Sequence, residues 1–598
     1  MRVAVEGCSH GELDLIYERV LAREREDGAF FDVLLLCGDF QAIRNHADLH
    51  SLAVPDKYRQ LGQFWKYYAG VKQAPLLTIV IGGNHEASNY MYELYYGGWL
   101  APNIYFLGEA GCVEVGDLVI AGASGIFKKF DYYRGRYERQ PYDKSGLRSI
   151  YHTRVYDIAR LKLLPQVDIV MSHDWPNTIE LHGNTNALLK RKPFFAEEIN
   201  TSTLGSPPLL ELLKILKPAF WCAAHLHVRF DAKYRHDGAA PNAALASLAS
   251  GSAQPQVATA DPNQIDIDDF DDDDDAGMSA APAATKPASD PNQIDIDDDD
   301  DDEDVDGEPI VMPSSATPVV KDFGDKEEPL VPAPESGSSA ADVPDASQDA
   351  SPAKAEPSDV STQSGATTFL ALGKCIKSQT YLEFFNVERG PSGRIVLRPS
   401  NRNALRQRLK PSNRPQTPLY FHRPWLAIVR ALHPWLSLEM HQPPLPSASD
   451  LAPKIREASA WIDANVVPAF SKGEGGEKEG KAESVLLPVT RVQRFALTAP
   501  PPPPESLRIV KLDLRRIPPS PPYLNPQTAA FCNMLGLDLR INSGPLKCPA
   551  QLLSTSFLPQ FVETPTPPPA PVPTQAPGPN PNTDQGAQSS TSGPVPSA

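Results

Sequence analysis

Short apolar runs alternate with amphipathic stretches over residues 1–235, and this alternation predicts a mixed α/β domain. The chain opens with the strand-like run RVAVEG, and the following LDLIYERVLAR has apolar residues at helical spacing. The next run, FDVLLLCGDF, is almost continuously apolar, which suits a strand that is covered on both faces. Further apolar runs occur at 74–86, 116–125, 166–176 and 219–230.

The pattern changes at residue 236, where hydrophobic periodicity gives way to Ala, Ser, Pro and Asp as far as residue 366. Within this segment DPNQIDIDDFDDDDD, at residue 261, is repeated as DPNQIDIDDDDDDED at residue 290. Neither copy has an apolar face, so the two copies cannot share a core as solenoid repeats do. We interpret residues 236–366 as a disordered acidic insert, with docking of basic partners as the alternative.

Ordered structure is expected again at residues 367–390, where two apolar runs flank a short polar break, as in a β-hairpin or as the last strands of the first domain. Beyond it, PLYFHRPWLAIVRALHPWLSL has apolar residues at helical spacing and predicts a small, mainly helical module over residues 403–545. A charged Gly/Lys/Glu loop and the polyproline run at 500–504 interrupt this module. The Pro-rich tail, 560–598, is expected to be disordered.

The charge is unevenly distributed along the chain. Residues 261–366 contain 31 Asp and Glu against 4 Lys, a net charge of −27, whereas the whole chain carries −18. The remainder therefore carries +9 and can approach a polyanion. Seven cysteines without regular spacing indicate a reducing compartment, and no apolar run has the length of a membrane helix. These features leave the cytosol or the nucleus as the expected compartment of the protein.

Candidate metal ligands follow five of the apolar runs. A single His in apolar surroundings is usually a core residue, but here five His, an Asp and an Asn all stand at strand ends, where α/β sheets gather their loops. The set suits two adjacent divalent cations bridged by one carboxylate. His85, next to a candidate ligand, is available to donate a proton. The expected ligands are Cys8, His10, Asp39, Asn84, His173, His225 and His227.

The order of GCSHG, GDF, GGNHE, SHDWP and AHLHVRF resembles that of the calcineurin-like metallophosphoesterases. That family has Asp two residues before the first His and Gly before the last His pair, whereas this chain has Cys8 and Ala224 there. These departures, together with GDFQAIRN, KYRQLGQFWKYY, GGNHEASNY and FLALGKC, resemble one branch, the RNA lariat debranching enzymes. The resemblance covers residues 1–235 and 367–388, and a C-terminal region that ends near NPQTAAFC.

This resemblance implies a β-sandwich flanked by helices, a nuclear protein with shuttling to the cytoplasm as a further option, and hydrolysis of the 2′,5′-phosphodiester at the branch point of excised intron lariat RNA. It implies that His85 protonates the departing oxygen. A thiolate ligand disfavours Mg²⁺, so we expect one or two ions of Fe²⁺, Zn²⁺ or Mn²⁺. The alternative for Cys8 is a small buried hydrophobe that is no ligand. The implied pockets are Asp39, Asn84, His173 and His225 for one ion, and Cys8, His10, Asp39 and His227 for the other.

A basic and aromatic segment within residues 124–154 supplies a candidate substrate surface. Basic groups meet phosphates while rings stack on splayed bases, which is how single-stranded RNA is bound. The segment corresponds to the lariat-recognition loop of the family it resembles; a plain solvated loop is the alternative. The residues expected to contact substrate are Lys128, Lys129, Tyr132, Arg134, Arg136, Tyr137 and Arg148.

Two other functions are compatible with part of the sequence. A phosphatase for nucleotides or phosphoproteins would need the same metal site, but the basic and aromatic loop argues against it. A non-catalytic scaffold would have lost ligands, whereas here only one position is unusual and His85 is present. Spliceosome or intron-turnover proteins are expected partners through the acidic insert or the Pro-rich tail, and no membrane is expected.

Overall fold

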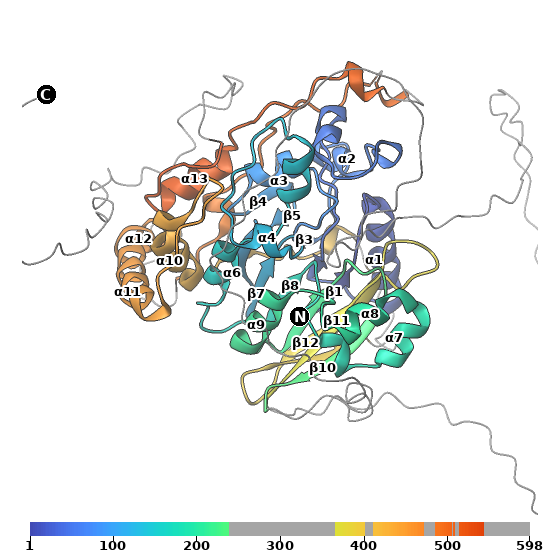
Figure 1. The fold of residues 1–598 in the computed structure, drawn as a ribbon, viewed down its shortest axis with the longest axis horizontal. Helices are drawn as coiled ribbons and strands as arrows, with labels where there is room; N and C mark the ends of the chain where they lie inside the picture. The colour runs from blue at the N-terminus through green and yellow to red at the C-terminus, as the bar shows by residue number, and fades with distance from the viewer. Residues whose placement is uncertain are drawn as a thin grey trace, which may run out of the picture. The chain divides into compact units, whose positions relative to one another are not determined.

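The computed structural model describes residues 1–237, 365–400, 409, 411–471, 485–504, 506–508 and 513–542. The Pro-rich tail and most of the acidic insert expected from the sequence lie outside these residues. Two seven-stranded mixed sheets form the centre of the described part, and helices flank them (Figure 1). Phe220 in one sheet and Phe385 in the other have ring centroids 5.5 Å apart, so the sheets pack through their inner faces. The predicted fold class is confirmed.

The first sheet has the order β13-β12-β1-β2-β3-β5-β4. Its central strands β1, β2 and β3 are parallel, which explains their continuous apolar sequences. Helix α1 buries Ile16 and Val20 in the core cluster that also contains Leu34 and Leu36 of β2. The strands are β1 (Arg2–Glu6), β2 (Val33–Leu36), β3 (Leu77–Val80), β4 (Gly98–Ala101), β5 (Ile104–Phe106), β12 (Leu382–Arg389) and β13 (Ile395–Pro399).

The second sheet has the order β10-β11-β9-β8-β7-β6-β14. Strands β7, β8, β9 and β11 are parallel, and antiparallel strands lie on either side of them. The carboxyl ends of β8 and β9 therefore lie side by side, as do those of β1, β2 and β3 in the first sheet. The strands are β6 (Ala110–Val115), β7 (Leu118–Ala123), β8 (Ile169–Ser172), β9 (Phe220–Ala223), β10 (Phe230–Arg235), β11 (Ala366–Ala371) and β14 (Leu419–Phe421).

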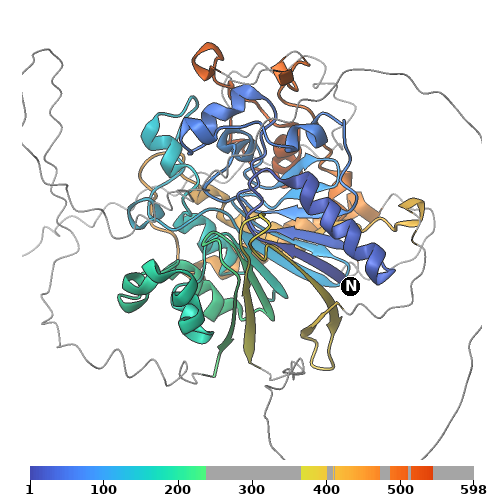
Figure 2. The same ribbon diagram turned by 90° about the vertical axis from the view of Figure 1, so that its right-hand side faces the viewer.

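The two strands that follow the acidic insert belong to different sheets. Strand β11 pairs with β9 and β10 in the second sheet, whereas β12 pairs antiparallel with β1 in the first. The hairpin alternative for residues 367–390 is therefore wrong, and each strand joins a sheet that also contains N-terminal strands. Figure 2 shows both strands running alongside the N-terminal ones.

The C-terminal residues cover the edges of both sheets. Strand β14 pairs with β6 and extends the second sheet. In the first sheet the side chain of Gln527 binds the backbone of the edge residue Trp99 twice, accepting from its N–H at 2.7 Å and donating to its carbonyl at 2.9 Å. Tyr68 donates to the carbonyl of Ala499 at 2.9 Å and so fastens the start of the polyproline segment to the N-terminal part of the chain. The described C-terminal residues thus contact both sheets at their edges.

Helices lie on the outer faces of the two sheets, with α10–α13 gathered near α6 in Figure 1. No helix among the described residues is long and apolar enough to cross a membrane. The α-helices are α1 (Leu13–Asp27), α2 (Phe64–Tyr68), α3 (Ser88–Glu93), α4 (Lys129–Tyr132), α5 (Lys144–Ser149), α6 (Val155–Leu161), α7 (Thr185–Arg191), α8 (Ala196–Asn200), α9 (Pro207–Leu216), α10 (Arg423–Leu432), α11 (Ala448–Asn465), α12 (Val467–Ser471) and α13 (Pro526–Met534).

Candidate active site

The candidate ligands lie in the loops at the carboxyl ends of five strands. In the first sheet these loops follow the adjacent strands β1, β2 and β3, and in the second they follow β8 and β9. Parallel neighbours present their carboxyl ends at the same edge, so both sheets direct polar side chains to one place. The ligands follow these strands in the order Cys8 and His10, Asp39, Asn84, His173, and His225 with His227.

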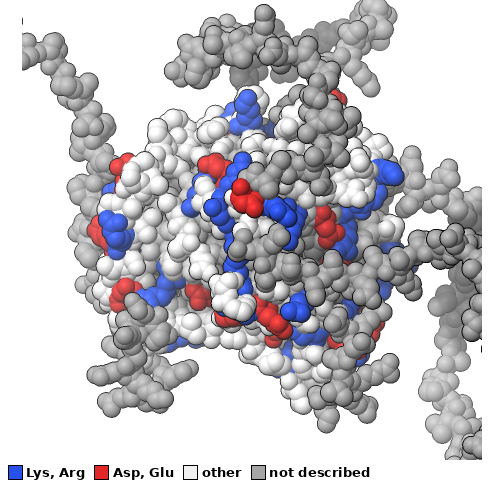
Figure 3. Space-filling view, turned by 90° about the horizontal axis from the view of Figure 1, so that it is seen from below, with Lys and Arg blue, Asp and Glu red and all other residues white. Residues whose placement is uncertain are grey.

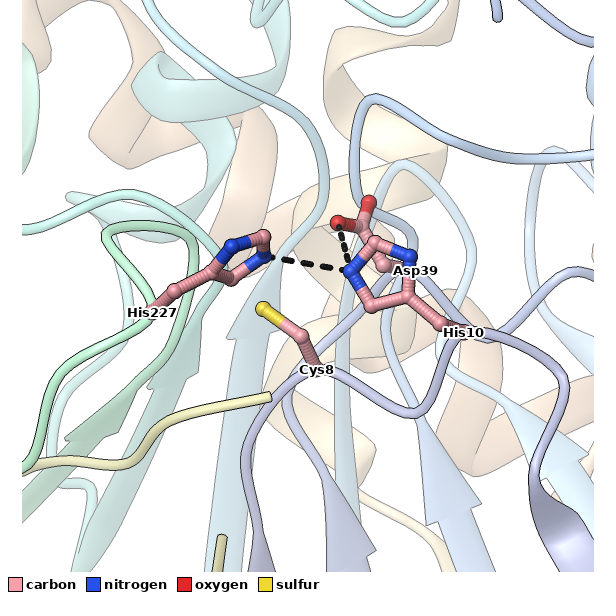
Figure 4. A group of neighbouring side chains, drawn as sticks. All are labelled: Cys8, His10, Asp39 and His227. Atoms are coloured by element: carbon pink, nitrogen blue, oxygen red, sulfur yellow. Dashed lines mark hydrogen bonds and ion pairs between the residues drawn. The ribbon is translucent and has the colours of Figure 1, made fainter. Parts of the chain in front are cut away.

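One donor group consists of Cys8, His10, Asp39 and His227, whose ligand atoms all lie within 4.8 Å of one another. Figure 4 shows the four side chains pointing toward a common centre. The Nε2 atoms of His10 and His227 are 3.1 Å apart, and His10 Nε2 is 3.5 Å from Asp39 Oδ2. The mixture of sulfur, imidazole and carboxylate is a donor set for a borderline or soft divalent cation.

A second donor group lies on the other side of Asp39. Nε2 of His173 is 3.3 Å from Asp39 Oδ1 and 3.1 Å from the amide oxygen of Asn84, and the His225 ring centroid is 5.0 Å from that of His173. Nδ1 of His173 bonds the carbonyl of Cys37 at 2.8 Å, which fixes the ring so that Nε2 faces the site. Asp39 therefore contacts both groups, as the bridging carboxylate expected from the sequence would.

The backbone of the site is held in strained conformations. Four of the candidate ligands have positive φ: 42° at His10, 48° at Asp39, 65° at His225 and 48° at His227. Such residues cost roughly 1–3 kcal/mol each and persist only where the surrounding structure fixes them. Close packing also requires Gly83, because a Cβ there would lie 2.2 Å from Asp39 Oδ1. Strain of this kind is typical of functional sites.

The electrostatics of the site fit bound cations. Asp39 is buried, and its Oδ2 atom has no hydrogen-bond partner among the described residues. Burial alone would raise the pKa of Asp39, but the neighbouring imidazoles, above all that of His173, hold it well below its usual range. Burial lowers the pKa of His10 and of His225 well below the usual value, so both rings are neutral, as metal ligands must be.

Cys8 is fully buried, and its Sγ atom accepts the backbone N–H of His225 at 3.1 Å. Burial raises the pKa of this thiol well above its ordinary value, and the nearby Asp39 carboxylate raises it further. A thiol in this position is protonated unless a cation stabilises the thiolate, which is the usual condition for a cysteine ligand. The structure places Sγ among the donor atoms of the first group.

His85 lies beside the donor groups without being part of either. Its backbone N–H donates to Asp39 Oδ1 at 2.9 Å, and its ring centroid is 5.5 Å from that of His10. The ring is partly exposed, and its buried Nδ1 atom has no partner among the described residues. This is a suitable position for a group that transfers a proton to a substrate atom.

One structural residue of the site was not singled out from the sequence. The buried carboxylate of Glu86 accepts the backbone N–H groups of Phe40 at 2.8 Å, Gly83 at 3.0 Å and Gln41 at 2.8 Å. Glu86 thereby ties the loop that carries Asp39 to the loop that carries Asn84. The signal was present in GGNHE, where an acidic residue directly follows the His.

The loop at residues 124–154 begins next to the donor groups. The backbone N–H of Gly125 donates to the carbonyl of Gly82 at 2.9 Å, and that of Phe127 donates to Asp174 Oδ2 at 3.3 Å. Large rings project into solvent farther along, with Phe130 72% and Tyr133 66% exposed. The loop therefore starts at the site and presents aromatic surface beyond it.

The residues predicted to contact substrate differ in how far the structure exposes them. Lys129 and Arg148 are exposed, while Lys128, Arg134 and Tyr137 are partly exposed. Arg134 bonds Asp131 within the same turn at 2.9 Å.

Two of the residues predicted to contact substrate, Arg136 and Tyr132, are buried in the structure. Arg136 is 2% exposed, and its guanidinium donates to Glu109 and Asp157 at 2.7 Å each and to the carbonyl of Ile150 at 2.6 Å. Tyr132 is 6% exposed. Both side chains hold the loop in place, and the exposed aromatic neighbours are better placed to meet a ligand. Sequence spacing alone did not distinguish the two kinds of position.

The fold and the two donor groups define a calcineurin-like phosphoesterase, and the family model of that description matches residues 1–229. A second family model, described as the C-terminal domain of lariat debranching enzyme, matches residues 364–540. The chain belongs to the lariat debranching enzyme family, because a relative of that name is 35% identical over 92% of this chain. Membership of the calcineurin-like phosphoesterases implies divalent metal ions at this site.

Individual relatives agree with both family models. The lariat debranching enzyme of Schizosaccharomyces pombe is 35% identical over 564 residues, which are 92% of this chain and 100% of that protein. Those of Homo sapiens and Arabidopsis thaliana are 56% and 52% identical over 237 residues, or 40% of this chain. These matches cover 44% of the Homo sapiens protein and 57% of the Arabidopsis thaliana protein.

Proposed function

We propose that this protein hydrolyses the 2′,5′-phosphodiester bond at the branch point of excised intron lariat RNA, and so linearises the intron for turnover. The observation that carries this proposal is the pair of donor groups sharing Asp39, with His85 beside them, in a chain of the lariat debranching enzyme family. The relatives named as lariat debranching enzymes support the same reaction.

The residues of the site divide the work of hydrolysis. Asp39 contacts both donor groups, with Oδ2 toward His10 and Oδ1 toward His173, and so holds the two groups next to each other. Divalent cations held there would supply positive charge to the phosphate oxygens and lower the pKa of water. The partly exposed ring of His85 donates a proton to the departing oxygen, which would otherwise leave as an alkoxide.

We propose Fe²⁺, Zn²⁺ or Mn²⁺ for the site, with Zn²⁺ or Fe²⁺ preferred where Cys8 is a ligand. Thiolate sulfur is a soft donor and imidazole a borderline one, whereas Mg²⁺ requires hard oxygen ligands in octahedral geometry. The set of Cys8, His10, Asp39 and His227 contains one oxygen donor residue among four, which supports this choice.

Recognition of the branched substrate is assigned to the loop at residues 124–154. Phe130 and Tyr133 offer exposed rings for base stacking, and Lys129 and Arg148 offer exposed charges for phosphates. On the face shown in Figure 3, basic and acidic side chains are interspersed. A local basic and aromatic loop next to the site thus supports RNA as the substrate. The expected nuclear location is tested by imaging the tagged protein.

The decisive experiment compares a 2′,5′-branched RNA with a linear RNA of the same nucleotides, using the purified full-length chain. We expect rapid loss of the branch and little cleavage of the linear RNA, and we expect a chelator to abolish the reaction until a divalent ion is restored. Equal cleavage of the two RNAs, or hydrolysis of a simple phosphomonoester without branch cleavage, would favour the phosphatase alternative.

A further inference from the structure

The turn between β11 and β12 brings a lysine to the edge of the metal site. Cys8 donates its backbone N–H to the carbonyl of Gly373 at 3.2 Å, and Cys375 donates to the carbonyl of Cys8 at 3.0 Å, so Cys8 and Lys374 form a parallel β-bridge. The approach depends on Gly7, where a Cβ would lie 2.3 Å from the carbonyl oxygen of Gly373. Two segments more than 360 residues apart in the sequence are therefore in backbone contact beside the first donor group.

The bridge determines the direction of the Lys374 side chain. Residues paired directly across neighbouring strands project their side chains to the same face. Cys8 directs its sulfur toward His10, Asp39 and His227 (Figure 4). Because Lys374 pairs with Cys8, its side chain projects on the face that carries this donor group. Burial dominates the pKa of Cys8 and that of His10, and the Lys374 ammonium is among the charges that act on both.

The turn that carries Lys374 is rigidly built. The backbone N–H of Lys374 donates to the side-chain oxygen of Gln379 at 2.8 Å, and its carbonyl accepts from Ile376 at 2.7 Å. Gly373 closes the turn by donating to the carbonyl of Thr380 at 3.0 Å. The Lys374 side chain is partly exposed, so it emerges from a fixed backbone position at the rim of the site.

We propose that Lys374 binds a phosphate oxygen of the branched RNA on the Cys8 side of the metal site. A lysine ammonium provides a compact cation with three donors, which suits a non-bridging phosphate oxygen. The loop at residues 124–154 connects instead with the loops that carry Asn84 and His173, through Gly82 and Asp174. Lys374 thus supplies a positive charge at the Cys8-bearing edge. This inference rests on the proposed function, because its ligand is the substrate of that reaction.

The test compares Lys374→Met, Lys374→Arg and, as a matched control, Lys377→Met, a change of an exposed lysine in the same turn. KM and kcat for a 2′,5′-branched RNA are measured over a range of NaCl concentrations, with metal content and thermal unfolding recorded for each protein. We expect Lys374→Met to raise KM about tenfold, because one hydrogen bond to a charged group is lost, and to change kcat less. The slope of log KM against log salt should fall by about 0.7, the value for one phosphate contact to a single strand.

Arginine should restore most of the affinity and the salt slope, and Lys377→Met should behave as wild type. The inference is overturned if wild type cleaves branched RNA and Lys374→Met keeps its KM and salt slope, or if Lys377→Met has the same effect. Loss of metal in parallel with activity would also overturn it, since Lys374 would then support the metal site instead of the RNA. Failure of wild type to cleave branched RNA would overturn the proposed function itself.

Discussion

Replacing His85 by Ala separates proton transfer from metal binding at this site. The bond from the residue 85 backbone N–H to Asp39 Oδ1, 2.9 Å long, does not involve the side chain and should remain. The ring nitrogen Nδ1 has no partner among the described residues, so its removal breaks no hydrogen bond seen there. We therefore expect the variant to fold and to keep both donor groups.

The size of each effect follows from these contacts. Without a lost hydrogen bond or ligand, the free energy of unfolding should change by no more than about 1 kcal/mol, and metal content should match wild type. Loss of a general acid typically slows a reaction by about 10²–10⁴-fold, which corresponds to roughly 3–5 kcal/mol in the activation barrier. KM should change much less than kcat, because the ring acts on the departing oxygen.

The assay is single-turnover cleavage of a 2′,5′-branched RNA, with metal analysis of the same preparations and RNA binding measured separately. Asn84→Ala serves as the contrast, since it removes a ligand oxygen 3.1 Å from His173 Nε2 and should lower metal content and activity together. A His85→Ala protein that loses metal in proportion to activity would refute the reasoning and make His85 a ligand or a structural residue. A variant with a wild-type rate would show that another group donates the proton.

Three further changes test other parts of the structure. Cys8→Asp should shift activation from Zn²⁺ or Fe²⁺ toward Mn²⁺ or Mg²⁺; unchanged metal content and ion preference would mean that the thiol is not a ligand. Glu180→Gln should increase stability at pH 8 by at most about 3 kcal/mol and much less at pH 5 in urea unfolding. Burial raises the pKa of Glu180 to about 7, so the folded protein is most stable while this carboxyl is protonated. That contribution to the free energy of unfolding is complete below the pKa of Glu180 in the unfolded chain and is lost as the pH rises through 7, and glutamine cannot lose it. An equal effect of the substitution at pH 5 and pH 8 would contradict this. Arg44→Met should cost about 3–5 kcal/mol in thermal unfolding, because it leaves the buried Asp48 and Glu93 carboxylates without their ion pair, and a loss below about 1 kcal/mol would count against that role.

Candidate ligands could be selected from the sequence, because each follows an apolar strand and the local pattern records where a strand ends. Parallel neighbours bring their carboxyl ends to one edge, so the strand pattern is enough to group Cys8, Asp39 and Asn84 in the first sheet. His173 follows a strand of the second sheet, and the packing of the two sheets brings it to the same place. The fold class followed from the same alternation and from the family resemblance. These are local features, and short segments of sequence contain them.

The packed structure was needed to show which side chains of the basic and aromatic loop are exposed to a ligand. Arg136 and Arg134 are two residues apart in similar sequence, yet one is buried against Glu109 and Asp157 and the other is partly exposed. The position of Lys374 beside Cys8 could not be predicted from the sequence either. It depends on a strand that follows the long insert and pairs with residues near the N-terminus. Burial and long-range pairing are properties of the packed chain, since they depend on partners that no local pattern specifies.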